Sequence, residues 1–142
     1  MANELDQTAA LAKRFFDSIE AGNIDAVGAC YADNVAIWHN TDGLIEDKVR
    51  NLKVLRRFVG HIKGIKYDQR RLSVFAGGFV HQHVLRGTRP DGVAVELPAV
   101  LVCTVRDGKI TRLDEYFDSA QVAVFTGSQG AGTNGATPLA KS

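Results

Sequence analysis

The second half of the chain alternates apolar and polar residues in long segments that are separated by turn sequences. Beyond Gly64 the spacing of apolar residues changes to a period of two, and turn signals interrupt it at Gly77-Gly78, Arg89 to Gly92 and Asp107-Gly108. The resulting strands are expected at 65–76, 79–88, 93–105 and 109–118. Short turns connect antiparallel neighbours, and strands longer than the typical length of about 5–6 residues must twist or bulge. The pattern therefore predicts a strongly curved antiparallel meander.

The first half of the chain shows helical spacing of its apolar residues, with a polar side chain able to cap each helix. Asn3, Asn23 and Asp47 are in capping positions. Helices are expected at 5–21, 23–31 and 47–60, with an exit at 32–34 and a short strand at 35–40. The apolar stripe of the third helix is expected to comprise Val49, Leu52, Leu55, Phe58 and Val59. A curved sheet wrapped around these helices would enclose a space, so the predicted class is α+β.

The length of 142 residues fits one domain, which we expect to span residues 1–126. After Thr126 the chain is rich in Gly, Ser and Thr and lacks large apolar residues up to Gly135. Residues 127–142 are therefore expected to form a flexible tail.

Charge and cysteine content narrow the possible partners and locations. A net charge of +1 gives no electrostatic reason to expect nucleic acid or a membrane surface as a partner. The N-terminus carries acids where a signal peptide carries bases, and no apolar run has membrane-spanning length. Cys30 and Cys103 lie in unrelated elements, which indicates free thiols in a reducing compartment. We expect a cytoplasmic protein with a small-molecule or protein partner.

Four polar residues share the phase of apolar neighbours on the expected strands. They are His39 beside Ile37, His81 and His83 between Phe79 and Leu85, and Glu115 between Leu113 and Phe117. Each histidine alone is compatible with a satisfied core or sheet-edge group. Together, three imidazoles and a carboxylate on one apolar face would form an acid–base site. A zinc site remains an alternative, because a His-x-His strand with a third histidine occurs in open zinc sites, but we expect no metal.

The expected geometry also assigns roles within this set. His39 should face the pocket from the side opposite the meander, while His83 and Glu115 approach each other across a closed cone. A carboxylate near an imidazole raises the pKa of the imidazole, so His83 would hold a proton and His39 would be the base. His61, at a helix end, is expected to be functionally silent.

The order of elements and several local motifs resemble the nuclear transport factor 2-like (NTF2-like) superfamily, in its SnoaL-like and ketosteroid-isomerase-like branch. The motifs include Gly22-Asn23, Tyr31 to Asn34, Asp107 to Ile110 and Glu115 to Asp118. The resemblance covers residues 5–125 and implies a cone-shaped α+β barrel with a pocket between sheet and helices. Many members of the family dimerise through the sheet. The exposed face of the meander carries Val80, Val84, Val100 and Val102, so we expect a homodimer.

The resemblance also implies roles for individual residues. His39 falls near the catalytic aspartate of the steroid isomerases, and Glu115 matches an essential aspartate of limonene epoxide hydrolases. His81 and His83 fall where those hydrolases carry an arginine and an aspartate, and scytalone dehydratase uses histidines and a carboxylate in this pocket. Phe15 and Leu97 replace the hydrogen-bond donors of the isomerases' oxyanion hole, which argues against steroid isomerisation.

These observations predict a cofactor-free acid–base enzyme of the lyase or isomerase type with His39, His81, His83 and Glu115 as catalytic residues. Its substrate would be small and largely apolar, of an aromatic or polyketide-like kind. Residues expected to contact the substrate are Phe15, Tyr31, Trp38, Leu97, Ala99, Leu101, Leu113 and Phe117. The alternatives are a non-catalytic binder of small ligands, an epoxide hydrolase and a protein-interaction module.

Overall fold

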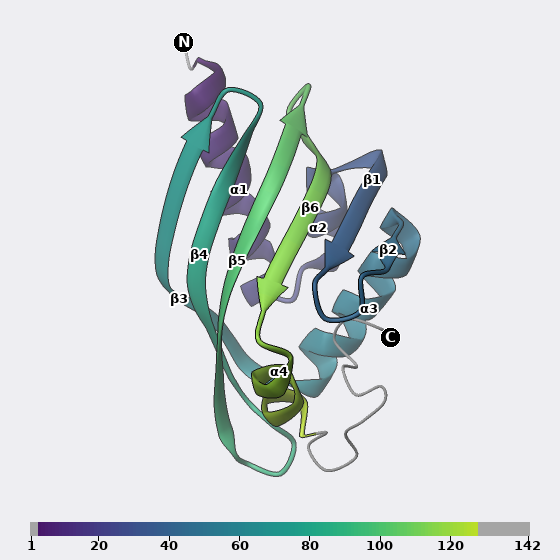
Figure 1. Cartoon of the computed structure of the whole chain (residues 1–142), viewed down its shortest axis with the longest axis vertical. Helices are drawn as coiled ribbons and strands as arrows, with labels where there is room; N and C mark the ends of the chain where they lie inside the picture. Colours follow the sequence, from purple (N-terminus) through teal and green to yellow (C-terminus); the bar gives the residue numbers. More distant parts are fainter. Residues whose placement is uncertain (1–2, 128–142) are drawn as a thin grey trace.

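The computed structural model describes residues 3–127 and has helices packed on one face of a curved sheet (Figure 1). The helices are α1 (Glu4–Glu20), α2 (Ile24–Cys30), α3 (Lys48–His61) and α4 (Ser119–Thr126). The strands are β1 (Tyr31–His39), β2 (Ile45–Glu46), β3 (Lys63–Phe75), β4 (Gly78–Thr88), β5 (Ala94–Arg106) and β6 (Lys109–Phe117). The predicted α+β class is confirmed. The tail expected at 127–142 lies outside the described residues except for Gly127.

The strand order is β2-β1-β6-β5-β4-β3, so the predicted meander of β3 to β6 is confirmed. The sheet curves without closing, because β2 and β3 are its edges. At the end of the sheet formed by β1 and β2, the structure differs from the prediction in two respects. The strand predicted at 35–40 starts at Tyr31 and lies parallel to β6, whereas β2 pairs antiparallel with β1 and was not predicted. His39 therefore lies in the same sheet as the meander, not opposite it.

The capping residues confirm where the first three helices begin. The side chains of Asn3, Asn23 and Asp47 accept hydrogen bonds from backbone N–H groups in the first turns of α1, α2 and α3. The predicted end of the second helix is wrong by one residue, because Tyr31 already has extended backbone and begins β1. Residues 32–34, expected as an exit, continue that strand.

The predicted apolar stripe of α3 is rotated in the structure. Val49 is 79% exposed, whereas Val54 and Phe58 are buried together with Asn51. Positions 51, 54 and 58 follow steps of three and four residues on one helix face, and Val49 lies on another. Because Asn51 on the inward face is polar, the pattern of apolar residues alone indicated the wrong face of the helix.

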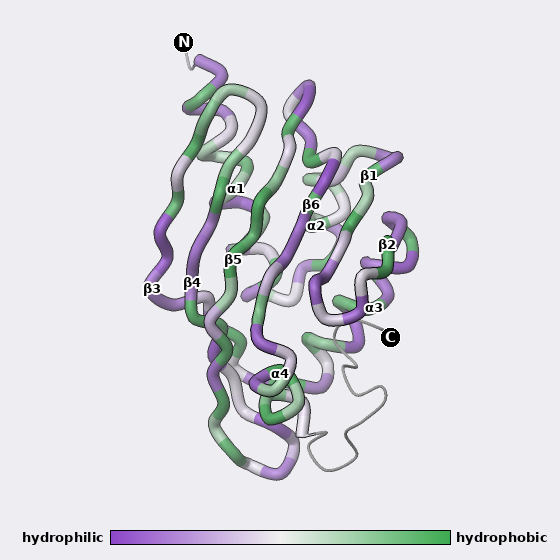
Figure 2. Tube along the Cα trace, in the orientation of Figure 1, coloured by the Kyte–Doolittle hydropathy of each residue, from purple (hydrophilic) through white to green (hydrophobic). Residues whose placement is uncertain are grey.

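The buried faces of the strands follow the period of two. Phe79, His81, His83 and Leu85 of β4 point inward, as do alternate residues of β5 from Leu97 to Cys103. In Figure 2, β5 is largely green while the middle of β6 is purple.

The helix α4 was not predicted; it is capped by Asp118 and buries Val122 and Phe125. None of the described helices is long and apolar enough to cross a membrane.

Candidate functional site

A cavity lies between the inner face of the sheet and helices α1 and α3. The space not filled by atoms is about 590 Å³ when the open mouth is included, and about 60 Å³ of it can hold the centre of a water molecule. The lining residues are Phe15, Phe16, Ile19, Tyr31, Ile37, His39, Asn51, Val54, Leu55, Phe58, Tyr67, Leu85, Leu101, Leu113, Glu115 and Phe117. Its walls are mostly apolar with few polar groups, as in sites for small molecules.

His39 and Glu115 form an ion pair in the wall of this cavity. The parallel pairing of β1 and β6 sets the two residues opposite each other, with 3.2 Å between His39 Nε2 and Glu115 Oε1. Phe117 stacks on the imidazole at a ring separation of 5.9 Å and an angle of 12°. The carboxylate expected beside His83 is therefore the partner of His39, and the expectation for His83 is wrong.

The surroundings of His39 favour its protonated form. Burial acts to lower the pKa of the imidazole, but the hydrogen bond to Glu115 and the charges of Glu115, Glu46 and Asp42 outweigh burial and raise it above the usual value. His39 therefore holds a proton more firmly than a free histidine. Next to it, the carboxylate of Glu115 is the more accessible partner, with its side chain 17% exposed against 8% for His39.

His81 and His83 form a separate buried pair. Their Nδ1 atoms are 2.8 Å apart, and the ring of His81 stacks on Phe16 at 3.8 Å. Burial lowers the pKa of His81 to about 4, aided by the charge of Arg70. Burial and the neighbouring His81 lower the pKa of His83 to about 3. Both rings are neutral at ordinary pH, with one Nδ1 donating a hydrogen bond to the other. Neither is among the cavity-lining residues.

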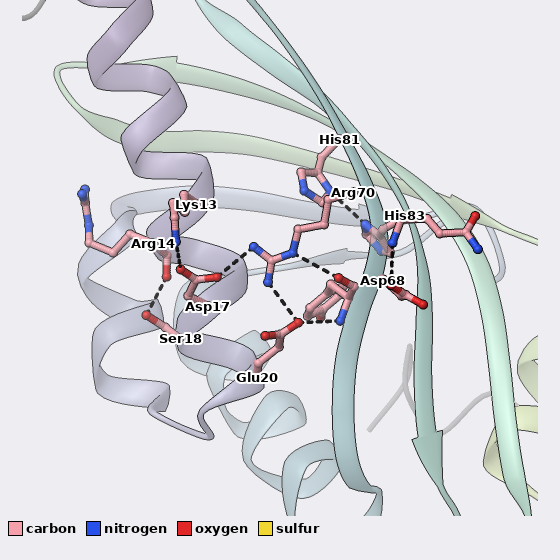
Figure 3. A network of polar contacts seen from close by, with 11 residues as sticks. Lys13, Arg14, Asp17, Ser18, Glu20, Asp68, Arg70, His81 and His83 are labelled. Carbon is pink, nitrogen blue, oxygen red and sulfur yellow. Dashed lines mark hydrogen bonds and ion pairs between the residues drawn. The ribbon is translucent and has the colours of Figure 1, made fainter.

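Arg70 fixes the edge strand β3 to α1 next to this pair (Figure 3). The register of β3 shifts between Asp68 and Arg71, and Gln69 adopts a positive φ of 54°. This bulge directs the Arg70 guanidinium to Asp17 at 2.8 Å and Glu20 at 3.0 Å. Glu20 also accepts a hydrogen bond from the Tyr67 backbone N–H at 2.6 Å. Arg70 is thus a structural ion-pair partner that ties β3 to α1.

The sequence matches the family model of the SnoaL-like domain over residues 12–113. The chain belongs to the SnoaL-like family. No protein of curated function matches this SnoaL-like chain.

Solved structures share the fold at low sequence identity. A proposed polyketide cyclase of Xanthomonas campestris is 21% identical, with a TM-score of 0.75 over 84% of this chain and 96% of that one. An LEH-like epoxide hydrolase of M. tuberculosis is 20% identical, with a TM-score of 0.73 over 84% and 88% of the two chains. A Catenulispora acidiphila protein with a ketosteroid isomerase-like fold, crystallised with trimethylamine, is 14% identical, with a TM-score of 0.76 over 89% and 99%. These likenesses establish the NTF2-like fold of the SnoaL-like chain.

The structure separates the predicted contact residues into two groups. Phe15, Tyr31, Leu101, Leu113 and Phe117 line the cavity of this SnoaL-like domain. Trp38, Leu97 and Ala99 do not line it, and their contact with a substrate stays a prediction. Trp38 lies one position out of phase with Ile37 and His39, so it projects from the other face of the sheet and packs on Tyr116 at 5.2 Å. Leu97 and Ala99 are buried on the inner face of β5, outside the cavity wall.

Sequence reasoning missed the polar residues Tyr67 and Asn51 in the wall, and Glu46 behind it. Tyr67 occupies an inward position of β3, and Asn51 lies on the buried face of α3. Burial, followed by the charge of Glu115, raises the pKa of Tyr67 far above its usual value, so its hydroxyl keeps its proton. The alternation of inward and outward positions in β3 is a sequence signal that could have placed Tyr67 on the inward face. Among residues 3–127, no cluster of three or more His, Cys, Asp or Glu side chains is arranged to hold a metal ion.

Proposed function

We propose that this SnoaL-like protein is a cofactor-free acid–base enzyme, of the lyase or isomerase type, for a small and largely apolar molecule. The observation that supports this most is the His39–Glu115 ion pair in the wall of an apolar cavity. A carboxylate beside a proton-holding imidazole can take a proton from substrate and return it. The fold and family are those of small-molecule enzymes and binding proteins.

In the proposed reaction Glu115 takes a proton from carbon next to a carbonyl group, or from a hydroxyl group. The protonated His39 balances the charge of Glu115 before transfer, and the pair then returns the proton to a shifted carbon or to a leaving hydroxyl. Tyr67 donates a hydrogen bond to the oxygen that gains negative charge. This assignment reverses the predicted role of His39 as base, because the group that raises the pKa of an imidazole lies beside His39 and not beside His83.

His81 and His83 take no chemical step in this proposal. Their rings are neutral and lie outside the cavity lining; His81 stacks on Phe16, and His83 meets Phe16 edge-on. Limonene epoxide hydrolases carry an arginine and an aspartate at these two places, so the alternative of that hydrolytic mechanism has no matching pair here.

We further propose that the protein is a cytoplasmic homodimer that binds neither nucleic acid nor membrane. Val102 is partly exposed on the face of the sheet opposite the helices, and Val80, Val84 and Val100 share that face. A second copy covering this face would remove apolar surface from water. The remaining alternatives are a non-catalytic carrier of small ligands and a protein-interaction module.

Proton exchange at carbon tests the proposed activity without knowledge of the natural substrate. A panel of small cyclic ketones is incubated with the protein in D₂O, and deuterium incorporation next to the carbonyl is followed by NMR. We expect exchange above the buffer rate that falls about a hundredfold or more in Glu115→Gln, since acid–base groups contribute about 10²–10⁴-fold. His61→Ala, an exposed histidine at the end of α3, is the matched control and should exchange like wild type. Saturable binding without exchange would favour the carrier instead.

A further inference from the structure

Three polar side chains form a chain of hydrogen bonds that ends at the cavity. The Tyr31 hydroxyl donates to Asn51 Oδ1 at 2.7 Å, and Asn51 Nδ2 donates to Glu46 Oε1 at 3.0 Å. Tyr31 and Asn51 line the cavity, whereas Glu46 lies behind them on β2 and is 2% exposed. The relay therefore connects the β1–β2 edge of the sheet to the substrate space through α3.

Glu46 sets the direction of every hydrogen bond in this relay. An ionised carboxylate can only accept, and a protonated one still offers its carbonyl oxygen, so the NH₂ group of Asn51 turns toward Glu46. The amide oxygen of Asn51 then faces Tyr31 and takes its one hydroxyl proton. The Tyr31 oxygen keeps only its lone pairs for a further partner, so it acts as a hydrogen-bond acceptor toward a ligand.

Tyr67 presents the opposite polarity to the same cavity. Its hydroxyl makes no hydrogen bond to any residue between 3 and 127, which leaves its proton available to a ligand. The ring stands edge-on to His83 at 4.7 Å and to Phe16 at 5.0 Å. These contacts hold the donor in place. One cavity thus combines a fixed acceptor at Tyr31 with a fixed donor at Tyr67.

We propose that the relay of Glu46, Asn51 and Tyr31 is a specificity device that selects small hydroxy-carbonyl compounds, with the substrate hydroxyl donating to Tyr31 and its carbonyl accepting from Tyr67. This inference rests on the proposed function, because it names the substrate class of the same cavity. Glu46 and Asn51 are positioning residues that act through Tyr31. A ligand without a hydroxyl leaves the buried Tyr31 oxygen unpaired, and such mismatches cost about tenfold or more in affinity.

Equilibrium binding of two ligands of nearly equal shape tests the device. Cyclohexanol can donate a hydrogen bond, whereas cyclohexanone can only accept, and their Kd values are measured by ligand-observed NMR at neutral pH. Wild type should prefer the alcohol. Asn51→Leu releases the Tyr31 proton toward the cavity, so the ratio of alcohol to ketone affinity should fall about tenfold. Glu46→Gln keeps an acceptor for Asn51 and should retain the wild-type ratio.

Further variants separate this role from a general loss of structure. Tyr31→Phe removes the acceptor and should also lower the alcohol preference, whereas Tyr67→Phe removes the donor and should raise it. An unchanged ratio in Asn51→Leu and Tyr31→Phe, or no binding of either ligand to wild type, would overturn the inference. The ratio of alcohol to ketone affinity is measured without turnover. If Glu115→Gln leaves proton exchange unaffected, the proposed catalysis is refuted, but the affinity ratio still tests the specificity device by itself.

Discussion

Mild acid should destabilise this protein through His81 and His83. Both rings are almost fully buried, and their pKa values are lowered to about 4 and about 3 in the folded state. In the unfolded chain a histidine takes up its proton near pH 6.5. The unfolded state therefore binds more protons below this pH, so stability is complete above about pH 6.5 and is lost as the pH falls toward 4 to 3.

The size of the loss in stability follows from the difference between the pKa of each histidine in the folded state and in the unfolded state. At pH 5 each histidine lowers the free energy of unfolding by ~2 kcal/mol, so the pair lowers it by ~4 kcal/mol. This is a large part of a typical domain stability of about 5–15 kcal/mol. The pKa of His39 is raised, so protonation of His39 at lower pH stabilises the folded state. This contribution offsets part of the loss from His81 and His83. The aspartates with lowered pKa, Asp17, Asp68 and Asp91, contribute only at lower pH.

Urea unfolding between pH 7.5 and 5, followed by the fluorescence of the single tryptophan, measures this dependence. Replacing His83 with Asn removes one of the buried imidazoles. It should lower stability at neutral pH but roughly halve the loss on acidification, whereas His61→Ala should reproduce the wild-type slope. A wild-type stability that stays constant from pH 7.5 to 5, or an unchanged slope in His83→Asn, would show that the two buried histidines do not destabilise the fold in acid.

Two further predictions concern the core and the assembly. Val54→Ala should lower the free energy of unfolding by about 1–2.5 kcal/mol, because Val54 is 4% exposed on the inward face of α3. Val49→Ala on the same helix should change the free energy of unfolding by no more than about 0.5 kcal/mol in the same urea titration. Equal losses of stability in the two variants would contradict the observation that Val54 faces inward and Val49 outward. Light scattering should give twice the mass of the chain for wild type and a smaller particle for Val102→Arg, because a charge on the proposed interface opposes dimerisation. A monomeric wild type would exclude the dimer.

Local patterns predicted much of this fold because its elements are strongly periodic. The inward positions of Phe79 and Leu85 follow from the period of two, and the starts of α1 and α3 follow from the caps Asn3 and Asp47. Two elements escaped prediction. The strand β2 has only two residues and so no period to detect, and α4 shows no separation of apolar and polar faces that would indicate a helix.

The candidate site was harder to predict because its decisive contacts are non-local. The phase of each strand placed His39 and Glu115 on inward faces, but only the parallel pairing of β1 with β6 makes them partners. No local pattern reveals that pairing. Glu46 and Asn51 resemble ordinary surface residues in sequence, yet both are buried, and Asn51 Nδ2 donates a hydrogen bond to Glu46 Oε1.

The proposed site depends most on the ion pair between His39 and Glu115, which NMR titration of the imidazole rings can test without any substrate. The chain has four histidines, and the ring signals of each are followed separately. In wild type the pKa of His39 should lie above that of a free histidine, and Glu115→Gln should bring it below the wild-type value because burial then acts with less opposition. A pKa of His39 that is already low in wild type, or that does not change in Glu115→Gln, would contradict the proposed site.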